Sequence, residues 1–320
     1  MTPASPSVMR GLLDDLLQAT EAAALAASTW RGRGDEKAAD QAAVDAMRQQ
    51  LQSVPMSGTV VIGEGERDAA PMLYVGEAVG AGTGPELDIA VDPLEGTTIC
   101  ATDAPGALAV LAAGARGSLL HAPDVYMEKL AIGPGCPEGL IRLDDPPADN
   151  LERIAEAKGC RVEDLTVCIL RRDRHADLVH AVRETGARLR LIGDGDVAAI
   201  IQVADADSPV DVYMGVGGAP EGVLAAAALA CTGGTMLGRL VFRDDGERAR
   251  AARAGIRNFD RVYSRSELAS GGTVLIVTGV TDGPLVQGPR QAANSVTCDS
   301  RVYSSDGRCE RRQATYLVPA

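Results

Sequence analysis

The stretch 92–98, Asp-Pro-Leu-Glu-Gly-Thr-Thr, constrains the fold and the chemistry of this chain more than any other. It follows residues 87–91, an apolar run broken only by one aspartate, which predicts a buried strand. Pro93 has no N–H to give to a sheet, so we expect the strand to stop there. Two carboxylates beside hydroxyls and free backbone N–H groups suit a divalent cation and a phosphate. The alternative is an ordinary turn at the end of a strand.

A second predicted strand end repeats this design earlier in the chain. Residues 59–62 predict a strand, and the glycine-rich turn after it carries Glu64 and Glu66. Ligands of sheet proteins bind outside strand ends, so the carboxylates of the two turns can converge there. Like charges this close resist joint ionisation unless a cation neutralises them. Together the two turns favour a metal site over solvated loops that point in different directions.

Composition narrows the class of protein. The chain has 320 residues, 46% of them hydrophobic, which suffices for one large domain or two packed lobes. No apolar run is long enough to span a membrane, and residues 1–10 lack the apolar core of a secretory signal, so we expect neither. A net charge of −13 argues against nucleic-acid or anionic-membrane partners. Seven scattered cysteines without a CxxC pair indicate reduced thiols in a cytoplasmic protein.

Helical periodicity dominates the start of the chain. Residues 8–27 and 35–52 predict amphipathic helices, and a short helix is expected over residues 71–79. Asp40 falls within the second of these helices. Judged from its neighbours alone, Asp40 is a solvated position on the helix surface.

After two adjacent prolines at 146 and 147, predicted strands alternate with predicted helices. This is the pattern of βαβ units around a parallel sheet. We therefore expect an N-terminal α+β lobe with the metal-binding carboxylates over residues 1–147. A C-terminal α/β lobe with substrate-binding loops is expected over residues 148–320, and the two lobes form one catalytic unit.

Two loops in the second half of the chain offer ligand-binding chemistry. Loop 215–222, Gly-Val-Gly-Gly-Ala-Pro-Glu-Gly, precedes an apolar helix whose positive end faces whatever the loop holds. Glu221 there is a helix-dipole partner, the favoured interpretation of this loop alone, or a metal ligand. The basic cluster 171–174 is equally a phosphate clamp or a solvated helix start. His175 and His180 are expected at the surface, and no serine-hydrolase nucleophile elbow is present.

Seven ordered motifs resemble the bacterial, GlpX-type class II fructose-1,6-bisphosphatases. That family belongs to the lithium-sensitive, inositol-monophosphatase-like group of sugar phosphatases. The resemblance runs from about residue 25 to residue 316. The motifs are Gly-Arg-Gly-Asp (32–35), Ile-Gly-Glu-Gly-Glu (62–66), Ala-Pro-Met-Leu-Tyr (70–74), Asp-Ile-Ala-Val-Asp-Pro-Leu-Glu-Gly-Thr (88–97), Ala-Pro-Asp-Val-Tyr-Met-Glu-Lys-Leu (122–130), Asp-Gly-Asp-Val-Ala (194–198) and Gly-Gly-Ala-Pro-Glu-Gly (217–222).

The resemblance implies a fold, a cofactor and a set of site residues. The implied fold is α/β with α+β character, a layered αβαβα sandwich, and the implied cofactor is Mg²⁺ or Mn²⁺. By position, the metal ligands are Asp40, Glu64, Asp92, Glu95 and Glu221. Thr97 and Asp40 are the implied catalytic residues, with Thr97 orienting the attacking water. The implied substrate-binding residues are Glu95, Gly96, Thr97, Tyr126, Arg172, Asp173, Arg174, Asp194, Gly195, Asp196 and Gly218.

The activity implied by the resemblance is hydrolysis of the 1-phosphate of fructose 1,6-bisphosphate, in gluconeogenesis or the Calvin cycle. A cytoplasmic homo-oligomer, a dimer or a tetramer, is implied as well. The alternatives are a dual fructose-1,6-/sedoheptulose-1,7-bisphosphatase and a non-catalytic, metal-dependent sugar-phosphate sensor. Three departures from the family bear on substrate preference and metal affinity. Glu36 stands at a usual lysine position, Thr98 replaces an arginine, and Arg-Asp-Arg at 172–174 replaces Lys-Pro-Arg.

Overall fold

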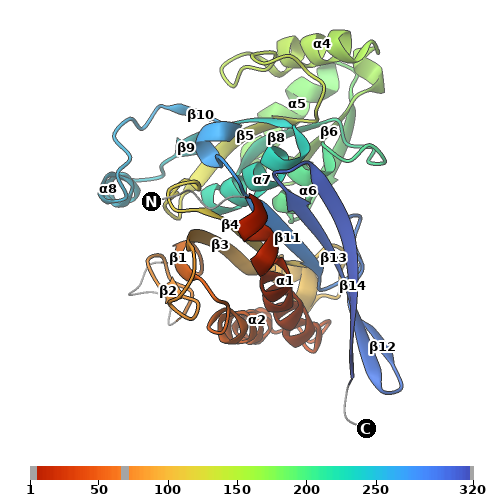
Figure 1. The fold of residues 1–320 in the computed structure, drawn as a ribbon. Coiled ribbons are helices and arrows are strands. Elements are labelled where there is room, and N and C mark those ends of the chain that lie inside the picture. Colours follow the sequence, from red (N-terminus) through yellow and green to blue (C-terminus); the bar gives the residue numbers. More distant parts are fainter. Residues whose placement is uncertain (1–5, 66–71, 318–320) are drawn as a thin grey trace. The chain divides into compact units, whose positions relative to one another are not determined.

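The computed structural model describes residues 6–65 and 72–317 (Figure 1). The chain divides into two compact units, residues 1–120 with 271–320, and residues 121–270. Each unit contains a mixed β-sheet with helices packed on it, which confirms the expected α/β class. The prolines at 146 and 147 lie at the start of helix α4 (Pro147–Lys158), inside the second unit.

The first unit is built on a sheet with the strand order β12-β13-β11-β4-β3-β1-β2, and β14 pairs with β13. Its strands are β1 (Ser57–Ile62), β2 (Ala78–Val79), β3 (Glu86–Glu95), β4 (Leu108–Ala115), β11 (Val274–Gly279), β12 (Arg290–Ala292), β13 (Ser295–Ser304) and β14 (Arg308–Leu317). Strands β1 and β3 run parallel, so both of their C-terminal ends reach the same edge of the sheet.

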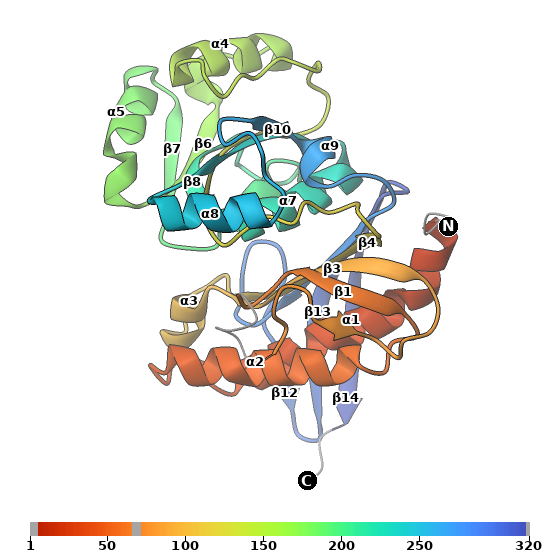
Figure 2. The same ribbon diagram turned by 90° about the vertical axis from the view of Figure 1, so that its left-hand side faces the viewer.

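Helices α1 (Pro6–Ser28) and α2 (Glu36–Leu51) lie together on one side of this sheet (Figure 2). Their apolar faces join β3 and β4 in one core, where Leu16, Met47 and Ile89 are fully buried. Burial of each such side chain contributes about 1.5–3 kcal/mol. The helices therefore hold the strand ends of this unit on a rigid platform.

The turn before α2 is tied to the short helix α3 (Thr97–Ala101), which follows β3. The backbone N–H groups of Gly32 and Gly34 donate to the carbonyls of Cys100 and Ala101, each at 3.0 Å. Asp35 then caps α2 by accepting a hydrogen bond from the N–H of Ala38 at 3.0 Å. These bonds fix the start of α2 relative to the end of β3.

The second unit contains a sheet with the strand order β10-β9-β5-β8-β6-β7. Its strands are β5 (Tyr126–Ile132), β6 (Thr166–Leu170), β7 (Arg188–Ile192), β8 (Val212–Gly218), β9 (Thr235–Val241) and β10 (Val262–Ser264). Strands β6, β7 and β8 run parallel, as the alternation of strands and helices predicted. Strand β5 pairs antiparallel with both β8 and β9, so the sheet is mixed and not fully parallel.

Helices cover both faces of the second sheet. Helices α4 and α5 (Ala176–Glu184) bury Leu151 and Val182 against Leu130 and Ile132 of β5. Gly222 of α7 (Ala219–Thr232) packs on Met127, whose side chain alternates to the other face of β5. The remaining elements are the helices α6 (Asp196–Gln202), α8 (Asp245–Arg253) and α9 (Arg265–Leu268), and the 3₁₀ turns η1 (Val162–Asp164) and η2 (Asp173–His175).

Among the described residues, no helix combines the length and the apolar character needed to cross a membrane. The short helix expected over 71–79 is absent from residues 72–79, which form turns and then β2. The backbone of this segment instead pairs with the turn after β1: the N–H of Glu64 donates to the carbonyl of Leu73 at 3.0 Å.

His175 is buried, with 2% of its surface exposed, so its expected surface position is wrong. Its Nδ1 lies 2.6 Å from the carbonyl oxygen of Leu170 at the end of β6, and its Nε2 accepts the N–H of Val216 in β8 at 2.8 Å. Because both ring nitrogens are occupied in this way, the imidazole is neutral, with its proton on Nδ1. Burial, reinforced by Arg174 and Arg172, lowers the pKa of His175 below its ordinary 6.5. His180 is exposed, as expected.

We expect stability to fall in mild acid partly because His175 must take up a proton. A lowered native pKa means that its stabilising contribution is complete above pH 6.5, the unfolded-state value, and is lost as the pH falls below it. Urea unfolding of His175→Asn should therefore depend less on pH between about 7.5 and 5.5 than unfolding of the wild type. His180→Asn should keep the wild-type dependence; equal pH dependence in all three proteins would contradict this account.

Candidate functional site

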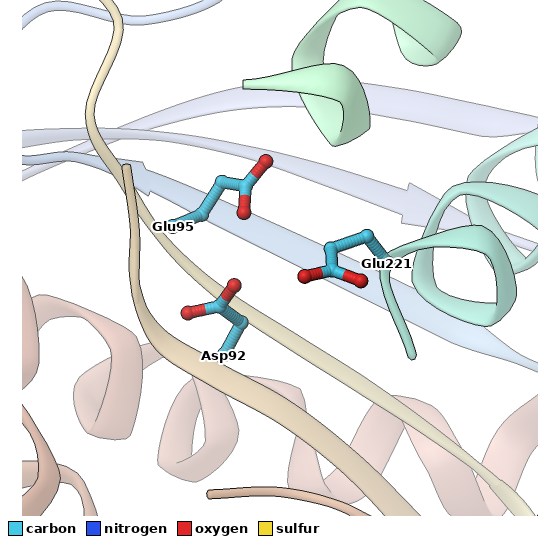
Figure 3. Close-up of side chains that lie close together, drawn as sticks. All are labelled: Asp92, Glu95 and Glu221. Carbon is cyan, nitrogen blue, oxygen red and sulfur yellow. The ribbon is translucent and has the colours of Figure 1, made fainter. Parts of the chain in front are cut away.

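Strand β3 runs through Pro93 to Glu95, so the expected stop at Pro93 is wrong. Asp92 lies opposite Val110 of β4 and Glu95 opposite Leu108, so three steps along β3 face only two along β4. This irregularity accommodates a proline without an N–H. It also brings together two side chains that a regular strand would send to opposite faces. Carboxylate oxygens of Asp92 and Glu95 lie within 4.8 Å of each other (Figure 3).

The turn after β3 places a hydroxyl beside these acids. Gly96 has a φ of 86°, a left-handed conformation that favours glycine, and it immediately precedes α3. Thr97 occupies the first helical position and is half-buried, whereas Thr98 is exposed. Glu95 is buried, with 5% of its surface exposed. Glu95, Gly96 and Thr97 therefore form the tight connection between β3 and α3.

Glu64 and Asp40 add their charges to this part of the first unit. Glu64 follows β1, and Ile62 at the end of that strand pairs with Ala90 of β3. Burial, and after it the charges of Asp40 and Asp92, raise the pKa of Glu64 from 4.5 to about 8. Burial also raises the pKa of Asp40, which is half-buried on α2. A bound divalent cation would relieve this repulsion, and carboxylate oxygens are its preferred ligands. Glu66 lies outside the described residues.

In the second unit, every expected substrate-binding residue lies at one edge of the sheet. Residues 172–174 follow β6, residues 194–196 follow β7, and Gly218 ends β8. Tyr126, the first residue of β5, lies opposite Gly218 in the antiparallel pair. The C-terminal edge of parallel strands is the usual place for a ligand in such sheets.

Asp196 is held by a buried ion pair at this edge. Lys129 Nζ donates to Asp196 Oδ2 at 2.6 Å, the hydroxyl of Tyr213 donates to the same oxygen at 3.3 Å, and both Lys129 and Asp196 are almost fully buried. A Cβ atom at Gly217 would lie 2.1 Å from that oxygen. The contacts of Asp196 therefore fix the start of α6. Sequence reasoning assigned no role to Lys129, although the residue lies within one of the recognised motifs.

Glu221 lies in the first turn of α7, directly after Pro220 (Figure 3). Its side chain folds back over Gly218, where a Cβ atom would lie 1.8 Å from Glu221 Oε2. Any larger residue at 218 would displace this carboxylate. The glycine is therefore required by the position of the glutamate.

Basic side chains gather around the loops of the same edge. Arg172 donates to the carbonyls of Arg171, at 3.1 Å, and of Gly193, which joins the loops after β6 and β7. The guanidinium of Arg174 lies 4.7 Å from the ring centroid of Tyr126, and that of Arg243 lies 5.3 Å from it. None of the seven motifs of the sequence includes Arg243, which follows the end of β9 by two residues, where Val241 lies opposite Tyr126.

We expect Glu64→Gln to stabilise the protein when divalent cations are removed with a chelator. The native pKa of about 8 means that burying Glu64 costs nothing below pH 4.5, and that the cost grows as the pH rises toward 8. At about pH 8 the variant should be more stable by roughly 1–3 kcal/mol, measured by urea unfolding. Glu86→Gln, which removes an exposed charge from β3, is the control. A variant no more stable than this control would contradict the expectation.

Comparisons with known proteins find a matching family and similar sequences. The model of the family described as "bacterial fructose-1,6-bisphosphatase, glpX-encoded" matches residues 10–316. A D-fructose 1,6-bisphosphatase class 2/sedoheptulose 1,7-bisphosphatase of Synechococcus sp. (strain JA-3-3Ab) is 44% identical over 322 residues, which cover 93% of this chain and 92% of the relative. The protein of the same description from Thermosynechococcus vestitus is 41% identical over 323 residues, covering 93% of each chain.

Proposed function

We infer that this chain, which belongs to the family of bacterial glpX-encoded fructose-1,6-bisphosphatases, is a phosphatase that hydrolyses fructose 1,6-bisphosphate. The products are fructose 6-phosphate and phosphate. The observation that carries this conclusion is a family match that runs through both units and includes all five expected acidic ligands. The family is metal-dependent, and the chain has a group of carboxylates able to hold a metal ion.

We propose that the ion is Mg²⁺ or Mn²⁺ and that two sets of residues bind it. Asp40 and Glu64 form one set, and Asp92, Glu95 and Glu221 form the other. Oxygen-only ligands suit these hard cations. The raised pKa of Glu64 supports the proposal, because a bound cation would stabilise the ionised carboxylates that repel one another there. When bound, such ions neutralise charge on the phosphoryl oxygens and make a bound water more acidic.

The residues of the chain supply positioning and proton transfer. We propose that the hydroxyl of Thr97 orients the attacking water and that Asp40 accepts its proton. Thr97 suits this role because it is the first residue of α3 and follows Glu95 by two residues. At the edge of the second unit, Arg172, Arg174 and Tyr126 hold the phosphate that is not hydrolysed. Positioning of this kind lowers the entropy cost of the reaction.

A second candidate activity is hydrolysis of sedoheptulose 1,7-bisphosphate. It is favoured by the dual names of the relatives at 41–44% identity. We also propose that the protein works in the cytoplasm as a homo-oligomer, a dimer or a tetramer. The cytoplasmic proposal is supported by seven cysteines that are all free thiols, as a reducing compartment requires.

Phosphate release with purified protein tests the proposed function. We expect release from fructose 1,6-bisphosphate in the presence of Mn²⁺ or Mg²⁺, and its loss when a chelator is added. Comparison of kcat/KM on the fructose and sedoheptulose bisphosphates separates a single from a dual activity. Tight binding of the sugar bisphosphates without any phosphate release would instead identify a sensor.

Thr97→Ala tests the proposed catalytic role of the threonine. Loss of a group that orients the nucleophile should lower kcat by about 100-fold or more. KM should change by less than about threefold, since the phosphates keep their other contacts. Thr98→Ala, which alters the exposed neighbour in the same helix, should keep kcat near the wild-type value. Unchanged turnover in Thr97→Ala would remove Thr97 from the mechanism.

A further inference from the structure

We propose that Arg243 is a specificity-determining residue that binds the non-hydrolysed phosphate of the sugar bisphosphate, and that Glu247 positions it. This inference rests on the proposed function. Nothing in the motifs or in the family resemblance assigned a role to either residue. The support comes from the register of β5, from the contacts of Tyr126 and from the buried position of Glu247.

Strand register places Arg243 beside the expected phosphate-binding residues. Tyr126 of β5 lies opposite Gly218 of β8 on one side and opposite Val241 of β9 on the other. Arg243 follows Val241 by two residues and reaches Tyr126 from β9. Arg174 reaches the same ring from the side of β8, where its Nε and Nη2 donate to the carbonyl of Val216 at 3.1 and 2.7 Å. The two guanidiniums thus contact one aromatic ring, Arg174 from η2 after β6 and Arg243 from the segment after β9.

Glu247 holds the guanidinium of Arg243 in place. Glu247 has 1% of its surface exposed and lies in the first turn of α8. Its carboxylate accepts the backbone N–H of Arg243 at 2.7 Å and Arg243 Nε at 2.5 Å. Burial raises the pKa of Glu247, but these hydrogen bonds outweigh that effect and lower it overall, so the carboxylate stays charged. A paired, oriented guanidinium loses less freedom when it binds an anion.

Arg243 nevertheless keeps the capacity to bind a ligand. Its side chain is 62% exposed, although Glu247 and Tyr126 fix its direction. The contacts described for Arg174 with Val216 and for Arg243 with Glu247 use Nε and Nη2, and Nη1 is the further donor group of each guanidinium. Two guanidiniums that contact one tyrosine ring repel each other, and a phosphate dianion bound by both would offset that repulsion. A sugar phosphate with its phosphate at this end fits that requirement.

The test compares ligands that carry only one of the two phosphates. In Arg243→Ala, KM for fructose 1,6-bisphosphate and the inhibition constant of fructose 6-phosphate should both rise about tenfold. The inhibition constant or KM of fructose 1-phosphate should stay within about twofold, and so should kcat on the bisphosphate. Arg248→Ala removes the same charge from an exposed position on α8 and should leave every constant unchanged.

Glu247→Gln tests whether the charge of Glu247 positions the guanidinium of Arg243. It keeps the shape of the side chain but removes the charge, so it should reproduce part of the rise in KM without lowering kcat. An unchanged KM in Arg243→Ala, or an equal rise for fructose 1-phosphate, would overturn the inference. Absence of bisphosphate hydrolysis in the wild type would instead overturn the proposed function, so the two failures are distinguishable.

Discussion

Mutual repulsion among carboxylates is the constraint on which the candidate site in the first unit depends. The parallel pairing of β1 and β3 brings Glu64 to the same sheet edge as Asp92, and α2 adds Asp40. Burial and, after it, the charges of Asp40 and Asp92 raise the pKa of Glu64 to about 8. The apolar core beneath the sheet maintains this unfavourable arrangement, since its buried side chains supply far more free energy than the acids cost. A bound metal ion would relieve the same repulsion.

Local patterns were enough to predict much of the fold. The helices over 8–27 and 35–52, and the strand over 59–62, correspond closely to α1, α2 and β1, because each has a clear pattern and clear boundaries. The expected helix over 71–79 was wrong because pairing with the turn after β1 determines that backbone. The hydrophobic periodicity of a segment carries no information about such a partner, which lies elsewhere in the chain.

The candidate site, too, was predicted from the sequence only in part. Acids and glycines at strand ends were found from their spacing, because a turn that approaches a ligand needs those residue types. Three contacts were beyond sequence reasoning: the ion pair of Lys129 with Asp196, the burial of His175 and the stacking of Arg243 on Tyr126. Each depends on the insertion of β5 between β8 and β9 or on the docking of η2 against β8. Only the folded chain brings those partners together.

The irregular pairing at Pro93 has a consequence for how such a chain can change. Removing one residue between Asp92 and Glu95 would restore an unbroken ladder with β4 and could leave the sheet better paired. The two acids would then be two residues apart, so a regular strand would keep both side chains on one face. An extra residue in β4 would also restore the ladder, but it would leave the acids three residues apart and send them to opposite faces. The sheet can therefore lose this irregularity and keep the pair of carboxylates only when β3 is shortened, not when β4 is lengthened.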